Sequence, residues 1–167
     1  TLNIELVVSS PNKRALQTAE YIAKGCGATT ETHGAFAATK YASSLVGKSK
    51  TGPEAEEYTQ ILKDMYERDP NAHYEDSENF NDLIKRFSEG FNYLENLTSE
   101  TVLVVTHESI LKSLAVHVLL NGQQTIHQHV NTKKTISKLD HIGISEMQFK
   151  GGRWQLVTWN DRSYFAE

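Results

Sequence analysis

Cysteine and long apolar runs are almost missing from this sequence of 167 residues. Cys26 is the one cysteine, so no disulfide can form within the chain and no cysteine-based metal motif is present. No apolar run approaches the roughly 20 residues that a membrane-spanning helix needs. The first residues, Thr-Leu-Asn, have neither the basic region nor the cleavage site of a secretory signal. These absences predict a cytoplasmic protein that does not interact with membranes.

A surplus of positive charge is missing as well. Lysine and arginine number 17 against 21 acidic residues, which gives a net charge of -4. A general nucleic-acid-binding protein needs a basic surface, so we expect no nucleic-acid partner. The apolar content of 38% is ordinary for a folded protein. The length suits one hydrophobic core, and we expect a single domain over residues 1–167.

Near its start the sequence passes from an apolar run into a helical pattern. The run over residues 4–8 breaks at Ser-Ser-Pro, and apolar residues then recur at helical spacing from Ala15. Arg14 falls in the first turn of this predicted helix. A helix N-terminus attracts anions through its unpaired N–H groups, and arginine offers a rigid fork of donors for phosphate. Residues 4–22 therefore predict a phosphate-binding pocket.

The remaining patterns predict further strands and helices in alternation. The expected elements are an edge strand within 28–36, a helix over 53–69, a helix with Ser77 as N-cap that carries Phe80 to Leu94, a strand over 101–106, a helix after His107, and a hairpin of strands 143–149 and 154–159. Residues 37–53, 71–77 and 123–141 predict no regular element. This order indicates an α/β sheet with helices on both faces.

Two polar sites are expected to meet at one edge of this sheet. Ser10 and Arg14 follow the first strand, and His107 follows the strand over 101–106. Ligands of open α/β sheets bind at the carboxyl ends of the strands, so these side chains could share one crevice. There His107 could donate a hydrogen bond to a phosphoryl oxygen or transfer a proton near neutral pH.

Other polar residues have simpler explanations. His127 and His129 would share a face only on a strand, and no third ligand is evident, so we expect no metal site. The lysine pairs Lys48/Lys50 and Lys133/Lys134 are expected on solvated faces, where they could also steer an anionic substrate.

Several segments together resemble the histidine phosphatase superfamily, also called the phosphoglycerate mutase-like family. Residues 10–20, SPNKRALQTAE, resemble its S-P-x-x-R-A-x-Q-T-A-E segment, and residues 104–107 resemble its second histidine motif. The helix around Arg86 and the final strands with Asn160-Asp161 resemble its later elements. The resemblance implies a three-layer α/β/α sandwich with a mostly parallel sheet and an antiparallel strand near the C-terminus.

The resemblance also implies a mechanism, namely phosphoryl transfer to a histidine followed by attack of water or an acceptor. In this mechanism His107 would be catalytic as a donor to the phosphoryl oxygens. The phosphate itself would be bound by Arg14, Ser10 and the backbone N–H of Glu108. No cofactor is implied, and the partner would be a small phosphorylated molecule.

The sequence departs from the family pattern at three places. It contains no Arg-His-Gly, the motif that carries the family's nucleophile, so we expect an N-terminally truncated domain that is inactive by itself. Glu108 replaces the usual glycine after the second histidine. No carboxylate lies within residues 36–40, where the family's general acid is expected, and Glu31 is the nearest candidate, which leaves the general acid unassigned.

The compact spacing between Pro11 and His107 resembles the small phosphatases of the family more than the mutases. The sequence therefore predicts a phosphomonoester hydrolase of the histidine phosphatase type whose nucleophile segment is absent from this chain. Two alternatives remain open. One is a non-catalytic member of the fold that binds an anion, and the other is phosphoryl transfer of the phosphoglycerate mutase type.

Overall fold

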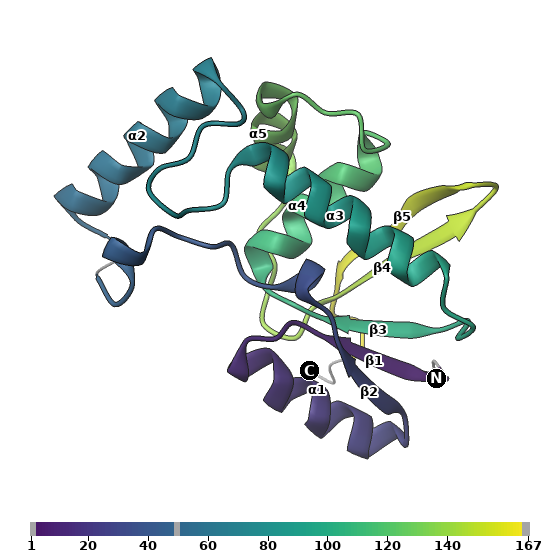
Figure 1. Cartoon of the computed structure of the whole chain (residues 1–167). Coiled ribbons are helices and arrows are strands. Elements are labelled where there is room, and N and C mark those ends of the chain that lie inside the picture. The colour runs from purple at the N-terminus through teal and green to yellow at the C-terminus, as the bar shows by residue number, and fades with distance from the viewer. Residues whose placement is uncertain (1–2, 49–50, 165–167) are drawn as a thin grey trace.

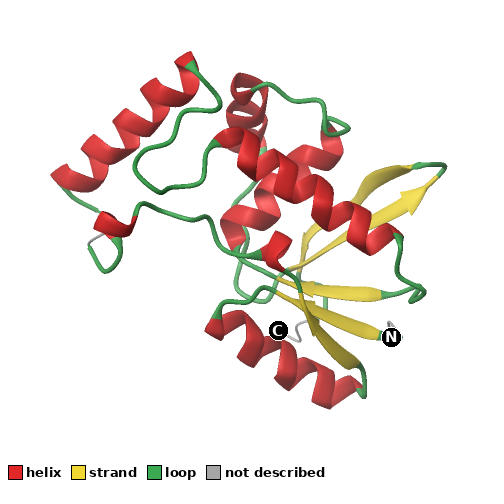
Figure 2. Cartoon of the chain, viewed as in Figure 1, coloured by secondary structure: helices red, strands yellow, loops and turns green. Residues whose placement is uncertain are grey.

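The computed structural model describes residues 3–48 and 51–164. In chain order the elements are β1 (Leu6–Ser9), α1 (Lys13–Cys26), β2 (Thr29–Thr32), the 3-10 turns η1 (Gly34–Phe36) and η2 (Ser43–Leu45), α2 (Pro53–Arg68), α3 (Phe80–Glu95), β3 (Val102–Val105), α4 (Glu108–Leu119), α5 (Ile126–Thr135), β4 (Ile144–Lys150) and β5 (Arg153–Asp161). Figures 1 and 2 show their arrangement. Within the described ranges, no helix is both long and apolar enough to cross a bilayer.

Three strands form a parallel sheet in the order β2-β1-β3. Helix α1 lies against one face, while α3 and α4 lie on the other side (Figure 1). The predicted three-layer α/β/α arrangement is confirmed. The segment over 28–36 contains the predicted edge strand, β2, whose residues are exposed.

The central strand is buried on both faces because its apolar residues occupy consecutive positions. Leu6 and Val8 point into the larger core, and Val7 points to the opposite face, where Ala19 and Ala23 of α1 cover it. The larger core is completed by apolar side chains from η1, α3 and α4, namely Phe36, Phe87, Phe91, Ile110, Leu114 and Val118.

The C-terminal hairpin forms a sheet of its own. Strands β4 and β5 pair antiparallel, and in the described part of the chain neither pairs with the parallel sheet. Gly151 and Gly152 form the turn with φ of 61° and 74°, a backbone region in which glycine has no steric penalty. Met147, Trp154 and Leu156 pack against the larger core. The predicted hairpin is therefore confirmed, but its connection to the core is by side chains.

Two expectations for local structure were wrong. Ser77 does not cap α3, because Asn79 is the N-cap and accepts from the backbone N–H of Asp82 over 2.7 Å. The Asp82 carboxylate accepts in return from the backbone N–H of Asn79, which completes a capping box. In residues 123–141, for which no element was expected, helix α5 begins after its N-cap Thr125.

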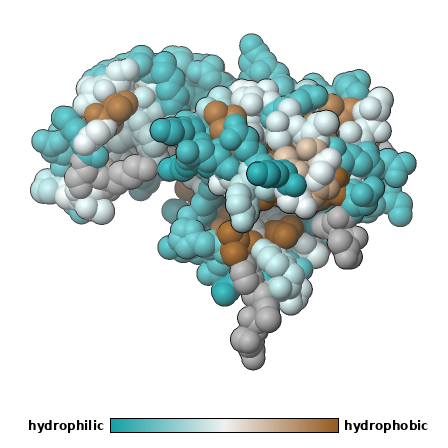
Figure 3. All heavy atoms as spheres, turned by 90° about the horizontal axis from the view of Figure 1, so that it is seen from below, coloured by the Kyte–Doolittle hydropathy of each residue, from teal (hydrophilic) through white to brown (hydrophobic). Residues whose placement is uncertain are grey.

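One face of the molecule is mainly hydrophilic. Seen from below, it carries a few separate hydrophobic areas among polar residues (Figure 3).

Candidate functional site

The site lies where β1 and β3 end. The backbone N–H of Ser10 donates to the carbonyl of Val105 over 2.9 Å, so the two segments still run side by side one residue beyond β1. The next turns lead into α1 and α4, whose first residues follow Asn12 and His107. The carboxyl ends of two neighbouring parallel strands and two helix N-termini are thus brought together.

The predicted residues meet at this edge. Ser10 Oγ lies 2.8 Å from His107 Nε2, although the two residues are 97 positions apart. Arg14 Nη2 and Nε lie 2.7 Å and 3.1 Å from His107 Nδ1, across 93 positions. Ser10, Arg14 and His107 are therefore joined in one cluster of direct hydrogen bonds.

Arg14 determines the tautomer of the neutral His107 ring. A guanidinium only donates, so Nδ1 accepts and the proton of the neutral ring is on Nε2, facing Ser10 Oγ. Burial lowers the pKa of His107, and the positive charges of Arg14 and Arg86 lower it further. The imidazole is therefore neutral near pH 7, and it gains a proton most readily when a negative charge is placed beside it.

Asn12 belongs to the cluster and was missed from the sequence. Its Oδ1 lies 3.0 Å from Ser10 Oγ and 3.1 Å from His107 Nε2, and it accepts from the backbone N–H of Ala38 over 2.9 Å. Asn12 is the N-cap of α1 by position but makes no side-chain cap bond there. Its amide instead joins the site to the loop after η1. Only its place between Pro11 and Arg14 could have indicated this role.

Arg86 of α3 holds the same loop from the other side. Its Nη1 donates to the carbonyls of Ala35 and Ala37 over 2.7 Å and 2.9 Å. Its Nε and Nη2 donate to the two carboxylate oxygens of Glu78 over 2.6 Å and 2.9 Å, a bidentate pair of largely buried side chains. The loop beside His107 is therefore fixed by charge-assisted hydrogen bonds.

The positive charge of Arg14 is available to an anion. Among the residues that the structure describes, no carboxylate forms an ion pair with it. Glu108 is the first residue of α4, so its backbone N–H has no acceptor within the helix. Its side chain is exposed, and its charge partly offsets the lowering of the Lys133 pKa that burial and Lys112 produce. The cluster therefore has hydrogen-bond donors and the positive charge of Arg14.

Glu31, the nearest carboxylate to the expected general acid, has another partner. It accepts a hydrogen bond of 2.5 Å from the hydroxyl of Tyr93 in α3. Burial and this carboxylate together raise the pKa of Tyr93 to about 12. Glu31 thus links β2 to α3.

The histidine pair lies on a helix and not on a strand. His129 is buried, with Nε2 at 3.3 Å from Ser113 Oγ, while His127 is exposed. Within residues 3–48 and 51–164, no group of three potential metal ligands occurs. The condition under which the two rings would share a face, a strand at residues 127–129, is therefore not met.

The lysine pairs also differ from expectation. Lys133 is not on a solvated face, because its Nζ donates to Ser113 Oγ over 2.6 Å and to Ser109 Oγ over 3.1 Å. Lys134 is exposed. Lys48 is exposed and lies 3.5 Å from the carboxylate of Glu54, whereas Lys50 falls outside the described residues.

The fold and the hydrogen bonds define an α/β protein with a cluster of Ser10, Arg14 and His107 at the carboxyl edge of a parallel sheet. The sequence model of the histidine phosphatase superfamily, branch 1, matches residues 1–162, and the chain belongs to this superfamily. No curated protein sequence matches the chain significantly.

Several solved structures share the fold. YhfR of Bacillus stearothermophilus is 21% identical with a TM-score of 0.71, and the match covers 96% of this chain and 76% of that protein. An alpha-ribazole phosphatase from Shigella flexneri is 17% identical with a TM-score of 0.68, over 98% of this chain and 76% of the other. A mycobacterial glucosyl-3-phosphoglycerate phosphatase, solved with inorganic phosphate, is 15% identical with a TM-score of 0.71, over 98% and 80%. At these identities the likeness shows the fold alone.

Proposed function

We propose that the protein acts in phosphomonoester hydrolysis of the histidine phosphatase type and that its substrate is a small phosphorylated molecule. The observation that carries this proposal is the contact of Arg14 with His107 at the carboxyl edge of the sheet. Arg14, Ser10 and the backbone N–H of Glu108 bind the phosphoryl oxygens. His107 donates a hydrogen bond to them and is the catalytic residue of this set. The superfamily and the phosphatases among the solved structures with this fold support the reaction class.

The chemistry needs such a set of donors. Charge on the equatorial oxygens must be stabilised as a phosphoryl group is transferred, and positioned positive groups contribute most of the rate enhancement. Arg14 supplies a fixed charge, the start of α4 supplies a backbone donor, and the segment over 35–38 is held beside His107 by Arg86 and Asn12. The hydrogen bonds of this segment keep the donors in place before the ligand arrives.

The mechanism also needs a residue that receives the phosphoryl group, and this residue differs from those that bind the phosphoryl oxygens. These 167 residues contain no Arg-His-Gly, so they supply the phosphoryl-binding half of the mechanism, and we expect no turnover through a phosphohistidine from these residues alone. One observation favours the alternative of a protein that only binds an anion. Both ring nitrogens of His107 are already engaged, Nδ1 by Arg14 and Nε2 by Ser10 and Asn12.

Binding of inorganic phosphate, measured by isothermal titration calorimetry, tests the site. Arg14→Ala should weaken binding about 10- to 100-fold, because a hydrogen bond to a charged group contributes about 1.5–3 kcal/mol. Arg68→Ala removes the same charge from the exposed end of α2 and should leave the affinity unchanged. Equal affinity of the parent and Arg14→Ala would show that phosphate binds elsewhere.

Turnover of p-nitrophenyl phosphate tests the mechanism independently of binding. We expect the 167-residue chain to release no nitrophenol above the background rate. Robust turnover that survives His107→Ala would contradict both the mechanism and the assigned site. Phosphate binding without turnover, even after the addition of an Arg-His-Gly strand segment, would favour the alternative of an anion-binding protein.

A further inference from the structure

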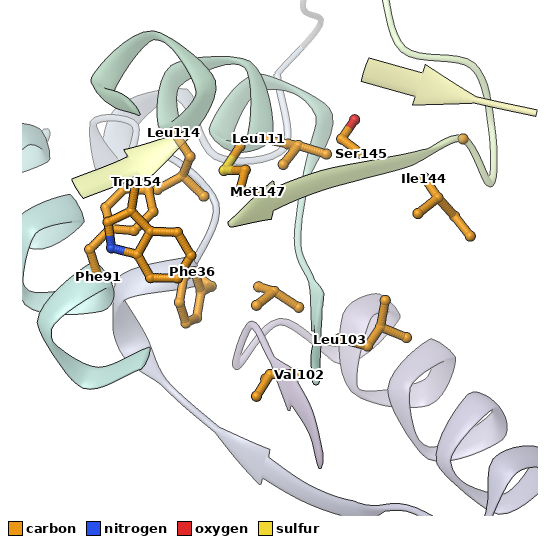
Figure 4. Close-up of a pocket in the computed structure, with 12 residues that line it drawn as sticks. Phe36, Phe91, Val102, Leu103, Leu111, Leu114, Ile144, Ser145, Met147 and Trp154 are labelled. Carbon is orange, nitrogen blue, oxygen red and sulfur yellow. The ribbon is translucent and has the colours of Figure 1, made fainter. Parts of the chain in front are cut away.

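The apolar cavity of this molecule offers no amino group, imidazole or thiol. It has a volume of about 180 Å³, lies between β3 and β4 and is bordered by Phe91 and Trp154 (Figure 4). Among the described residues that line it there is no lysine, histidine or cysteine. A lysine that is partly withdrawn from water lies elsewhere, between α4 and α5, and it is Lys133.

Lys133 is held by two hydroxyl groups of the neighbouring helix. Helix α5 packs against α4 (Figure 1), and Ser109 and Ser113 stand one turn apart on the side of α4 that meets Lys133. Nζ of Lys133 lies 2.6 Å from Ser113 Oγ and 3.1 Å from Ser109 Oγ. Ser113 is buried, whereas Ser109 is exposed. The amino group is thus fixed in position, with one contact in the interior and one at the surface.

No carboxylate neutralises the amino group of Lys133. Within residues 3–48 and 51–164 no ion pair includes it, although α2 and α4 both pack against α5. On its own helix, the buried ring of His129 is neutral near pH 7 because its pKa is about 4. Burial and the charge of Lys112 lower the pKa of Lys133 to about 8, and Glu108 offsets only part of this lowering. A substantial fraction of the amino group is therefore neutral, and hence nucleophilic, near neutral pH.

We propose that Lys133 is a site of reversible covalent modification by small aldehydes, which it binds as an imine. The lone pair of the neutral amine attacks the carbonyl carbon, and a proton passes from the nitrogen to the carbonyl oxygen, so that a carbinolamine forms. The carbinolamine then loses water, and a C=N bond replaces the C=O bond. The step needs no leaving group on the aldehyde and no oxidant or reductant. The protonated imine keeps one N–H for Ser113 Oγ, the buried acceptor that held the amine. This proposal does not depend on phosphate binding.

Competitive labelling of the folded chain tests the proposal. Glycolaldehyde is added below one equivalent near neutral pH, with sodium cyanoborohydride to reduce each imine as it forms, and peptide mass spectrometry locates the product. Lys133 should react at least about tenfold faster than Lys134, the exposed next residue, because a pKa of about 8 leaves far more neutral amine than the usual lysine value of about 10.4. Without the reductant, dialysis against aldehyde-free buffer should restore the mass of the unmodified protein.

Protein variants test the cause of the reactivity. Lys112→Gln removes a positive charge beside the amino group, so the pKa of Lys133 should rise and its labelling should slow. Lys85→Gln removes the same charge from an exposed position on α3, which has no effect on the Lys133 pKa, and should leave the rate unchanged. Lys133→Arg should lose the fast label and leave the slow label at Lys134. Circular dichroism checks that all three variants keep the parent's fold.

Three results would overturn the proposal. Equal labelling of Lys133 and Lys134 in the folded protein would mean that the contacts with α4 do not activate the amine. A preference for Lys133 that persists in concentrated urea would belong to the local sequence and not to the fold. Equal rates in the Lys112→Gln and Lys85→Gln variants would mean that the charges around Lys133 do not control its reactivity.

Discussion

The guanidinium of Arg14 donates to the same ring nitrogen of His107 that an anion between the two side chains would contact. An anion cannot accept from Nδ1 while this nitrogen is unprotonated. Binding between Arg14 and His107 therefore requires a proton on Nδ1, and the negative charge of the ligand favours the doubly protonated ring, so we expect the proposed ligand and a proton to bind together. The low pKa of His107, which burial, Arg14 and Arg86 produce, makes this uptake measurable near neutral pH.

This coupling predicts how affinity changes with pH. Sulfate is a suitable probe, because its own charge does not change between pH 6 and 7.5. Because the pKa of free His107 lies below its usual value of 6.5, the free ring becomes increasingly neutral as pH rises through this range, and we expect the bound ring to stay protonated. Affinity should therefore fall as pH rises, by up to about tenfold per pH unit for one proton. Calorimetry at several pH values measures the slope. The range ends below pH 8, since burial lowers the pKa of Lys133 to about 8.

The control for this titration is His107→Asn, which keeps a polar side chain that does not titrate. Its sulfate affinity should be weaker and should not depend on pH over the same range. A parent protein whose affinity is flat with pH would mean that the anion binds without protonating His107. A slope that persists in His107→Asn would assign the proton to another group.

Helix α5 shows where capping residues matter more than apolar periodicity. Among its described residues only His129 is buried, so its sequence has no apolar stripe. Its start is instead fixed by a capping box, in which Thr125 accepts from the backbone N–H of Gln128 and Gln128 accepts from that of Thr125. The helix is held to α4 by Lys133, which donates to Ser113.

Removing this cap should lower stability by a small and measurable amount. Thr125→Ala leaves the backbone N–H of Gln128 without its acceptor, and we expect the free energy of unfolding to fall by about 1 kcal/mol. Urea unfolding followed by tryptophan fluorescence measures the change. Thr98→Ala, at an exposed residue in the loop after α3, is the matched control and should change stability little. A loss in Thr125→Ala no larger than in this control would mean that α5 depends on its contacts with α4 alone.

Most of the elements that the sequence predicted correctly have a strong apolar pattern, whereas the exposed strand β2 was predicted from its β-branched residues. β1, α1, α3, β3 and α4 each have one, and so do the strands of the hairpin. Polar α5 has no such pattern, and the cap of α3 is two residues from the one expected because Asn79, and not Ser77, has a partner at the third helical position. Apolar periodicity predicts an element that buries one face, so it does not predict an element whose side chains are mostly exposed.

Part of the site was predictable for a similar reason. Ser10, Arg14 and His107 each follow a recognisable strand, and parallel pairing brings the ends of neighbouring strands together. Asn12 and Arg86 belong to the site because they form hydrogen bonds with the loop over residues 35–38. Those hydrogen bonds depend on the path that this loop takes in the folded chain. No local pattern in the sequence predicts the path of this loop.

Across the whole molecule, buried histidines recur beside the core. His107, His117 and His129 are each less than 9% exposed, and burial lowers the pKa of all three. For His129 the value falls to about 4, because burial acts together with the charges of Lys133 and His117. The ring of His117 stacks on that of Phe91 with 5.4 Å between the ring centroids. The ring of His129 meets that of Phe80 edge-on with 5.5 Å between the ring centroids. Folding therefore favours the neutral form of these rings.

This preference predicts that stability falls in mild acid. A histidine whose pKa is lower in the folded state binds its proton in the unfolded state first, so its contribution is complete above about pH 6.5 and is lost as pH falls toward 4. Each such ring contributes up to about 1.4 kcal/mol per pH unit in that window. Exposed Asp76, Asp140 and Asp161, whose pKa values are also lowered, act mainly below it.

The contribution of His129 can be separated from the rest by substitution. Urea unfolding at intervals between pH 4.5 and 7 gives the slope of the free energy of unfolding against pH. His129→Asn should reduce that slope by an amount that corresponds to at most one bound proton. Part of the slope should remain, because the other buried rings still titrate. His127→Asn, on the exposed side of the same helix, should keep the slope of the parent, since water surrounds His127 in both states. If His129→Asn kept the slope of the parent, the acid sensitivity would belong to His107 and His117. An equal loss of slope in both variants would instead mean that α5 unfolds before the core does.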